Sequence, residues 1–152
     1  MSTPSTKSFN DAFTSASRRD GALTPYHEAQ LDKLQEIADA IVGGTLSAST
    51  QESQPVTVAM VRESLMRQDA QNYSRSCEAL AAVQSAALED IGMQTLLITG
   101  DEDPVAPPST AHDMSRRLPK ARVVVLSRCG HWTPFERHVE CANLLEESLR
   151  RA

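Results

Sequence analysis

Hydrophobic residues in the first half of the chain recur three or four positions apart, a spacing that predicts amphipathic helices. The first such stretch covers residues 27–42, and the pair Gly43 and Gly44 is expected to end it. Residues 46–55 are rich in Ser, Thr and Gln and are predicted to form a linker. Residues 1–25 show no hydrophobic period and predict a flexible N-terminal arm.

Two more helices are predicted before the character of the chain changes. One covers residues 56–67, and the next begins after Asp69, a good N-cap residue, and runs to about Ala87. The residues that share the inward-facing stripe of these two helices are Val58, Val61, Leu65, Tyr73, Cys77, Leu80 and Val83.

From about residue 91 the pattern becomes strand, helix, strand, helix. The runs 93–99 and 122–127 are apolar on both faces, which is typical of buried parallel strands. Helices are predicted over 109–118 and 134–151, and Thr133 with Glu136 would make a capping box for the second. The inner stripe of this last helix is expected to contain Val139, Ala142, Leu145 and Leu149. This order of elements indicates an α/β class with two parallel strands.

An acidic and a basic side chain follow these strands. Asp103 lies in the loop after the first strand, and His131 lies in the turn after the second. The carboxyl ends of neighbouring parallel strands meet at one edge of a sheet, so the two residues should lie close together. An aspartate that orients a histidine is half of a relay for nucleophilic catalysis.

The segment MQTLLITGDEDPVAPPSTAHDMSRRLPKARVVVLSRCGHWTPFERHVECANLLEESL resembles the end of an α/β-hydrolase. In that family one late strand ends in a Gly-x-x-Asp loop and the next ends in a Gly-His turn. The resemblance implies that Asp103 is the triad acid and His131 the triad base, within an incomplete α/β-hydrolase fold.

The preceding helical region looks like the cap of such an enzyme. The stretch VRESLMRQDAQNYSRSCEALA is similar to caps of the enol-lactonase-like branch, which hydrolyses small esters and lactones. This resemblance implies a substrate pocket to which Trp132 and Tyr73 would contribute, although ordinary helix packing is the alternative for Tyr73. The implied domains are an arm (1–25), a cap-like segment (26–90) and the C-terminal part of a hydrolase core (91–152).

One part of the family pattern is missing from the sequence. The family nucleophile is a serine in a Gly-x-Ser-x-Gly elbow, and no pair of the six glycines brackets a serine in this way. The remaining serines considered, Ser47, Ser109 and Ser127, do not follow a strand in a glycine-flanked turn. The resemblance therefore implies a truncated hydrolase, about the C-terminal half, that is inactive as an isolated chain.

Composition narrows the range of partners. The net charge is −5 and the basic residues are scattered, so no nucleic-acid partner is expected. No secretory signal and no apolar stretch of roughly 20 residues is visible, which predicts a cytoplasmic protein without a membrane span. The three cysteines fit no zinc motif, and no metal is expected. The resemblance to α/β-hydrolases implies no cofactor, because the mechanism of that family needs none.

Three hypotheses about function remain open from the sequence. The chain is an inactive fragment, or a hydrolase of small esters or lactones that a missing N-terminal half or an unconventional nucleophile completes. The third hypothesis is a non-enzymatic protein that uses its cap helices and unpaired strand edges to form a homodimer or to join a complementing protein.

Overall fold

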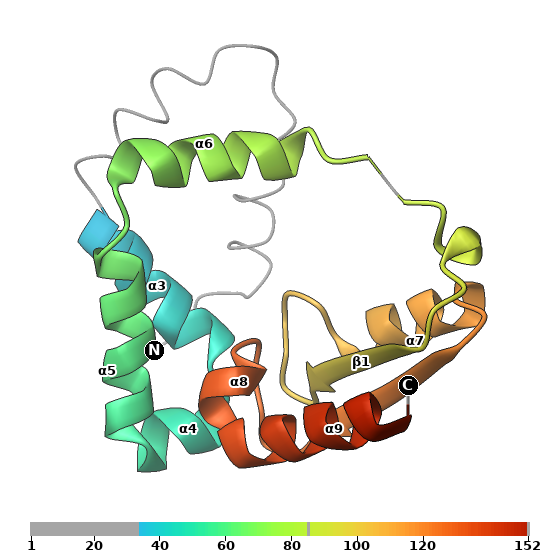
Figure 1. The fold of residues 1–152 in the computed structure, drawn as a ribbon. Helices are drawn as coiled ribbons and strands as arrows, with labels where there is room; N and C mark the ends of the chain where they lie inside the picture. The colour runs from blue at the N-terminus through green and yellow to red at the C-terminus, as the bar shows by residue number, and fades with distance from the viewer. Residues whose placement is uncertain (1–33, 85, 152) are drawn as a thin grey trace. The chain divides into compact units, whose positions relative to one another are not determined.

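The computed structural model describes residues 34–84 and 86–151. Its elements are α3 (Leu34–Thr45), α4 (Ala48–Ser53), α5 (Pro55–Met66), α6 (Ala70–Ala81), the short 3-10 helix η1 (Leu88–Asp90), β1 (Thr95–Gly100), α7 (Pro108–Arg117), β2 (Ala121–Leu126), α8 (Thr133–Glu136) and α9 (His138–Arg151) (Figure 1). The described residues form two compact units, one of 34–44 with 62–84 and one of 45–61 with 86–151. Residues 45–61 thus share a unit with the strands. The sequence analysis assigns them to the cap-like segment 26–90, and the division into these domains stays a prediction.

The strands of the second unit form a two-stranded parallel sheet, as the sequence predicts. Thr95 lies opposite Ala121 and the register continues to Gly100 opposite Leu126, so both strands end at the same edge. The loops that follow β1 and β2 therefore start side by side. This register brings the start of the Asp103 loop next to the start of the His131 turn.

Helices α7 and α9 cover the two strands. Figure 1 shows α7 behind the sheet and α9 in front of it. Alternate strand residues face α9, because side chains along a strand point to opposite sides in turn. The cluster on this side consists of Ile98, Val124, Leu126, Cys129, Cys141 and Leu144.

The predicted inner stripe of the last helix is wrong. Val139, Leu145 and Leu149 are 55%, 54% and 78% exposed, and it is Cys141 and Leu144 that pack toward the strands. α9 has apolar residues on two faces, and a sheet of two strands is wide enough to cover only one of them. The docking of the helix, not its hydrophobic period, decides which face is buried.

The start of this helical region also differs from the prediction. Arg137, at φ −135° and ψ 52°, separates α8 from α9, so the helix is not continuous from 134 onward. Thr133 is the first residue of α8 and not its cap, and the residue before it, Trp132, makes no side-chain capping bond. The predicted capping box is therefore wrong, and the carboxylate of Glu136 has a different use, described below.

The predicted linker 46–55 is also wrong, because it contains α4. Ser47 caps this helix: its hydroxyl accepts a hydrogen bond from the Thr50 backbone N–H (3.2 Å) and donates one to Thr50 Oγ1 (2.9 Å). Both residues are almost completely buried. The same Ser and Thr content that suggested a linker supplies the cap and the buried hydroxyl pair.

Helix α3, most of which lies in the first unit, continues through Gly43 and Gly44 and ends at Thr45, so the predicted stop is wrong. The part of that helix predicted over 27–33, like the predicted arm 1–25, lies outside the described residues. Ala38 and Val42 are buried, as their spacing predicts.

The helices predicted over 56–67 and after Asp69 are confirmed as α5 and α6. Asp69 Oδ1 accepts from the Asn72 backbone N–H at 2.9 Å, which confirms the cap. α6 ends at Ala81, however, and Leu80 and Val83 are 55% and 69% exposed, so their predicted inward orientation is wrong. Across residues 34–84 and 86–151, no helix combines the length and the apolar character that crossing a membrane requires.

Candidate active site

Asp103 is a buried carboxylate fixed by the loop that carries it. Its side chain is 4% exposed. Oδ1 accepts hydrogen bonds from two backbone N–H groups of the same loop, those of Val105 (2.8 Å) and Ala106 (2.9 Å). Two aimed backbone donors stabilise the negative charge and hold the carboxylate in one orientation.

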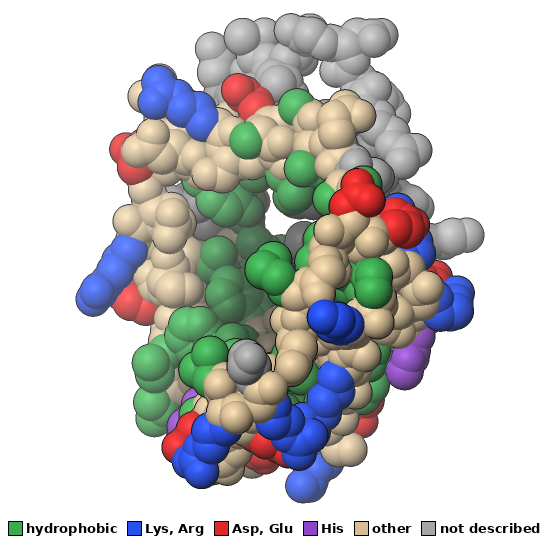
Figure 2. Space-filling model, turned by 45° about the vertical axis from the view of Figure 1, so that its right-hand side comes forward, with side chains coloured by type: hydrophobic (Ala, Val, Ile, Leu, Met, Phe, Trp, Pro, Cys, Tyr) green, Lys and Arg blue, Asp and Glu red, His purple; other side chains and the backbone are tan. Residues whose placement is uncertain are grey.

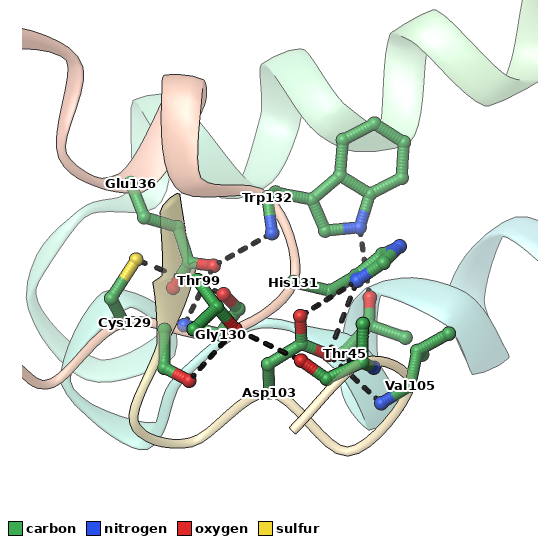
Figure 3. Close-up of polar contacts among 11 residues, drawn as sticks. Thr45, Thr99, Asp103, Val105, Cys129, Gly130, His131, Trp132 and Glu136 are labelled. Carbon is green, nitrogen blue, oxygen red and sulfur yellow. Dashed lines mark hydrogen bonds and ion pairs between the residues drawn. The ribbon is translucent and has the colours of Figure 1, made fainter. Parts of the chain in front are cut away.

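His131 points its imidazole toward this carboxylate (Figure 3). Nδ1 lies 2.9 Å from Asp103 Oδ2 and 3.1 Å from Oδ1. The two residues therefore lie in hydrogen-bond contact, close together as their positions after neighbouring strands predict. The His131 side chain is 40% exposed, so one side of the ring is open while the other faces a buried acid.

The contact decides which ring nitrogen carries the proton. A carboxylate can only accept a hydrogen bond, so Nδ1 carries the proton in this contact, and in the neutral imidazole Nε2 then keeps its lone pair. Within the part of the chain that the structure describes, no hydrogen bond to Nε2 occurs. With Nδ1 bound to the acid, the ring is arranged so that Nε2 can act as a general base, the role histidine has in nucleophilic catalysis.

Two glycines allow the loops to approach this closely. A Cβ on Gly100 would lie 2.0 Å from the carbonyl oxygen of Cys129, and a Cβ on Gly130 would lie 2.2 Å from that of Thr45. Both obstacles are backbone atoms, which cannot rotate away as a side chain can. Glycine is therefore required at both positions by close approach.

Thr45 connects the histidine turn to the end of α3. Its carbonyl oxygen accepts from the His131 backbone N–H (2.8 Å), and its hydroxyl accepts from Trp132 Nε1 (2.8 Å). The Trp132 ring also meets Phe135 edge to face, with centroids 5.7 Å apart. These contacts fix the indole next to His131, and the predicted lining of a substrate pocket by Trp132 stays a prediction.

The sequence model of a protein family described as the α/β hydrolase fold matches residues 9–138 of this chain. The chain belongs to the α/β-hydrolase family. Among curated proteins, a pimeloyl-[acyl-carrier protein] methyl ester esterase from Nitrosomonas europaea is 32% identical over 109 residues, which is 66% of this chain and 43% of that protein. A 2-hydroxymuconate semialdehyde hydrolase from Pseudomonas sp. strain CF600 is 32% identical over 78 residues, 51% of this chain and 27% of that protein.

Solved structures of the family show the same fold. A thermophilic esterase from Thermogutta terrifontis has a TM-score of 0.75 at 20% identity, covering 99% of this chain and 52% of that one. The enol-lactonase from Burkholderia xenovorans LB400 has a TM-score of 0.73 at 23% identity, covering 95% of this chain and 51% of that one. The chain thus spans about half the length of these structures, and less than half of the two curated relatives.

The three serines considered in the sequence, all within the described part of this α/β-hydrolase chain, do not lie as a family nucleophile would. Ser47 is 1% exposed, and its hydroxyl is occupied as the cap of α4. Ser109 is in the first turn of α7, and Ser127 directly follows β2 without a glycine on either side. No hydrogen bond joins any of the three to the His131 ring in the described part of the chain.

Tyr73, the other residue predicted to line a substrate pocket, is half-buried on α6 in the first unit. Its role stays a prediction. No group of three His, Cys, Asp or Glu residues that could hold a metal ion occurs among residues 34–84 and 86–151.

Two acids beside Asp103 make contacts that the sequence did not suggest. Asp101 Oδ1 accepts from the Cys129 N–H (3.1 Å), and Glu102 Oε2 accepts from the Ala48 N–H (2.9 Å). Both residues are exposed, as expected of loop acids, yet each ties the loop after β1 to another segment. A run of acidic residues after a strand predicts such contacts only weakly. Their partners are backbone N–H groups, which every residue except proline has, so the sequence pattern does not identify them.

Cys129 is next to the histidine turn but does not suit the role of nucleophile. It is fully buried, and this burial, with the Glu136 carboxylate adding to it, raises the pKa of its thiol to about 12. Burial also raises the pKa values of the half-buried Cys77 and of Cys141.

These pKa shifts predict the order of thiol modification. At pH 8 only about one Cys129 thiol in 10⁴ would be ionised, and the thiolate is the reactive form. We expect iodoacetamide to modify Cys77 first and Cys129 only after unfolding in guanidinium chloride, as read by peptide mass mapping. Modification of Cys129 as fast as Cys77 in the folded chain would contradict the burial seen here.

Proposed function

We propose that this chain is the acid-and-base half of an α/β-hydrolase that cleaves small esters or lactones, with the serine nucleophile supplied from outside this chain. The observation that carries the proposal is the His131–Asp103 pair. Its buried acid is fixed by backbone donors, and the side chain of its base is 40% exposed.

The chemistry that this pair can perform follows from the tautomer. Nε2 takes the proton of a serine hydroxyl as its oxygen attacks the ester carbonyl, and Asp103 stabilises the imidazolium that forms. The protonated Nε2 then gives that proton to the alkoxide leaving group, which departs as the alcohol and leaves an acyl-serine. Water, deprotonated by the same nitrogen, releases the acid. No cofactor takes part in these steps.

The proposed substrate class rests on similarity. The curated relatives include a methyl ester esterase, and the similar solved structures include an esterase and an enol-lactonase. Carboxylic esters and lactones share the acyl carbon that the proposed mechanism attacks. A cytoplasmic location agrees with this proposal and stays a prediction.

A chimera tests the proposed function. This chain would replace the matching part of the Nitrosomonas europaea esterase, and hydrolysis of p-nitrophenyl butyrate would be measured with fluorophosphonate labelling read by intact mass. We expect the purified chain alone to remain unlabelled, and the chimera to be labelled and active. His131→Ala should abolish the activity of the chimera, while His138→Ala, an exposed histidine at the start of α9, should leave it unchanged.

Two results would reject the proposal. An active chimera that is indifferent to His131→Ala would show that this histidine is not the base. Labelling of the isolated chain would place a working nucleophile within it.

One observation favours a second candidate, a non-enzymatic assembly protein. Three large side chains of α9, Val139, Leu145 and Leu149, are more than half exposed, and Figure 2 shows hydrophobic side chains reaching the surface beside clusters of Lys and Arg. In the described chain β1 pairs only with β2. Analytical ultracentrifugation of the chain at about 100 μM tests this candidate. A native chain that sediments as a monomer, and a Leu149→Glu variant with the same sedimentation coefficient, would count against it.

A further inference from the structure

The buried carboxylate of Glu136 has no role in the chemistry proposed above. Its residue is 2% exposed, although it lies at the end of the four-residue helix α8. A buried carboxylate is costly unless hydrogen bonds compensate for its lost hydration. The contacts that compensate it indicate what it does.

All three of its hydrogen bonds come from backbone N–H groups in two separate segments. Oε1 accepts from Gly130 (3.0 Å) and Trp132 (3.2 Å), which are the residues on either side of His131. Oε2 accepts from Ser47 (2.9 Å), 89 positions earlier in the chain. The carboxylate is therefore a bridge between the histidine turn and the segment that follows α3. Figure 3 shows its bond to Trp132 on the side of the histidine turn.

The bridge complements the bond that His131 itself makes. The His131 N–H donates to the Thr45 carbonyl, so three consecutive N–H groups, from Gly130 to Trp132, are all held by Glu136 or by the segment it binds. The turn that carries the imidazole is fixed on both sides. Its distance to Asp103 is consequently set by Glu136 as well as by the strands.

We infer that Glu136 is a positioning residue that holds His131 against Asp103 and so keeps the imidazole in its Nδ1–H tautomer. The expected effect of Glu136 on catalysis rests on the proposed hydrolase function. Its expected effect on the geometry of His131 is independent of that function.

Glu136→Gln is the variant that tests the inference with the least change in shape. A glutamine has one acceptor oxygen and one donor group where the carboxylate has two acceptors. In one amide orientation the donor faces the Ser47 N–H, and in the other it faces those of Gly130 and Trp132. Either way one end of the bridge loses its acceptor.

The readout is NMR of the full chain, which requires no hydrolysis. Long-range ¹H–¹⁵N spectra should show His131 as the Nδ1–H tautomer in the native chain and as a mixture of tautomers in Glu136→Gln. Hydrogen exchange of the amides at one end of the bridge should accelerate by about tenfold or more, because each loses a bond to a charged acceptor. Glu102→Gln is the matched control: it removes an exposed carboxylate from the neighbouring Ala48 N–H and should leave the His131 tautomer unchanged.

A folded Glu136→Gln chain that keeps the single Nδ1–H tautomer would overturn the inference, whatever its thermal stability, because Glu136 would then act on stability alone. If that variant does not fold, exchange in the native chain decides. The amides of Ser47, Gly130 and Trp132 should exchange slowly and at similar rates, and exchange as fast as in an unfolded peptide would overturn the inference. Failure of the chimera to hydrolyse esters would leave these results standing and count only against the proposed function.

Discussion

Replacing Asp103 by asparagine is expected to lower the turnover of the chimera by roughly 10⁴-fold, the size of the effect when a triad acid is made neutral. The structure gives the reason. Asp103 Oδ1 is held by the N–H groups of Val105 and Ala106, so the single oxygen of an asparagine would remain there. Its NH₂ group would then take the place of Oδ2, 2.9 Å from His131 Nδ1. Two donors cannot share that contact, so the ring proton moves to Nε2 and the base is lost.

The check on this prediction separates the tautomer from folding. Asp103→Asn should keep the far-ultraviolet circular dichroism of the native chain while His131 changes to the Nε2–H form by ¹⁵N NMR. Asp101→Asn, which alters an exposed acid two positions earlier, should retain most of the activity. Full turnover in folded Asp103→Asn would contradict the assignment of Asp103 as the acid.

Gly130→Ala is expected to destabilise the second unit by about 3 kcal/mol or more, since the new Cβ cannot be accommodated by side-chain rotation. That Cβ would lie 2.2 Å from the Thr45 carbonyl oxygen and 2.7 Å from the Ser47 nitrogen. Gly100→Ala should have a comparable effect, because its Cβ would meet the Cys129 carbonyl oxygen at 2.0 Å. Thermal unfolding measured by circular dichroism provides the test.

Gly92→Ala is the matched control for these substitutions. Gly92 lies just before β1 in the same unit, and no atom lies within 4 Å of the position that a Cβ would occupy there. Its replacement should be neutral or stabilise the fold by about 0.5 kcal/mol, because alanine restricts the unfolded chain. Equal losses of stability in Gly92→Ala and Gly130→Ala would show that close approach is not the reason for glycine at position 130.

Much of the second unit was predictable because its signals are local. Two apolar runs separated by a helix predict parallel strands, and the register of β1 with β2 then places Asp103 and His131 at one edge. Asp103 and His131 lie only three and five positions after the strands that they follow, which end at Gly100 and Leu126, so no long-range information is needed to place them at this edge. The Asp69 cap is predictable for the same reason, since its partner is three residues away.

The errors concern features that depend on distant contacts. Glycines such as Gly43 and Gly44 commonly mark the end of a helix, yet α3 continues to Thr45. The carbonyl and hydroxyl of Thr45 accept hydrogen bonds from the histidine turn. α9 carries two apolar faces, and its hydrophobic period could not tell which one meets the strands. Glu136 had a plausible local role as a capping residue, and its real partners include an amide 89 positions away.

The α/β class, the two parallel strands, and the places of Asp103 and His131 after them follow from the amino-acid sequence alone, because each depends on neighbouring residues. How His131 is held could be seen only in the folded chain. The bond from His131 to Thr45, the bridge through Glu136, and the approach that requires glycine at positions 100 and 130 all join segments far apart in the chain. Backbone groups make most of these contacts, and every residue has them, so no side-chain pattern can reveal them in advance.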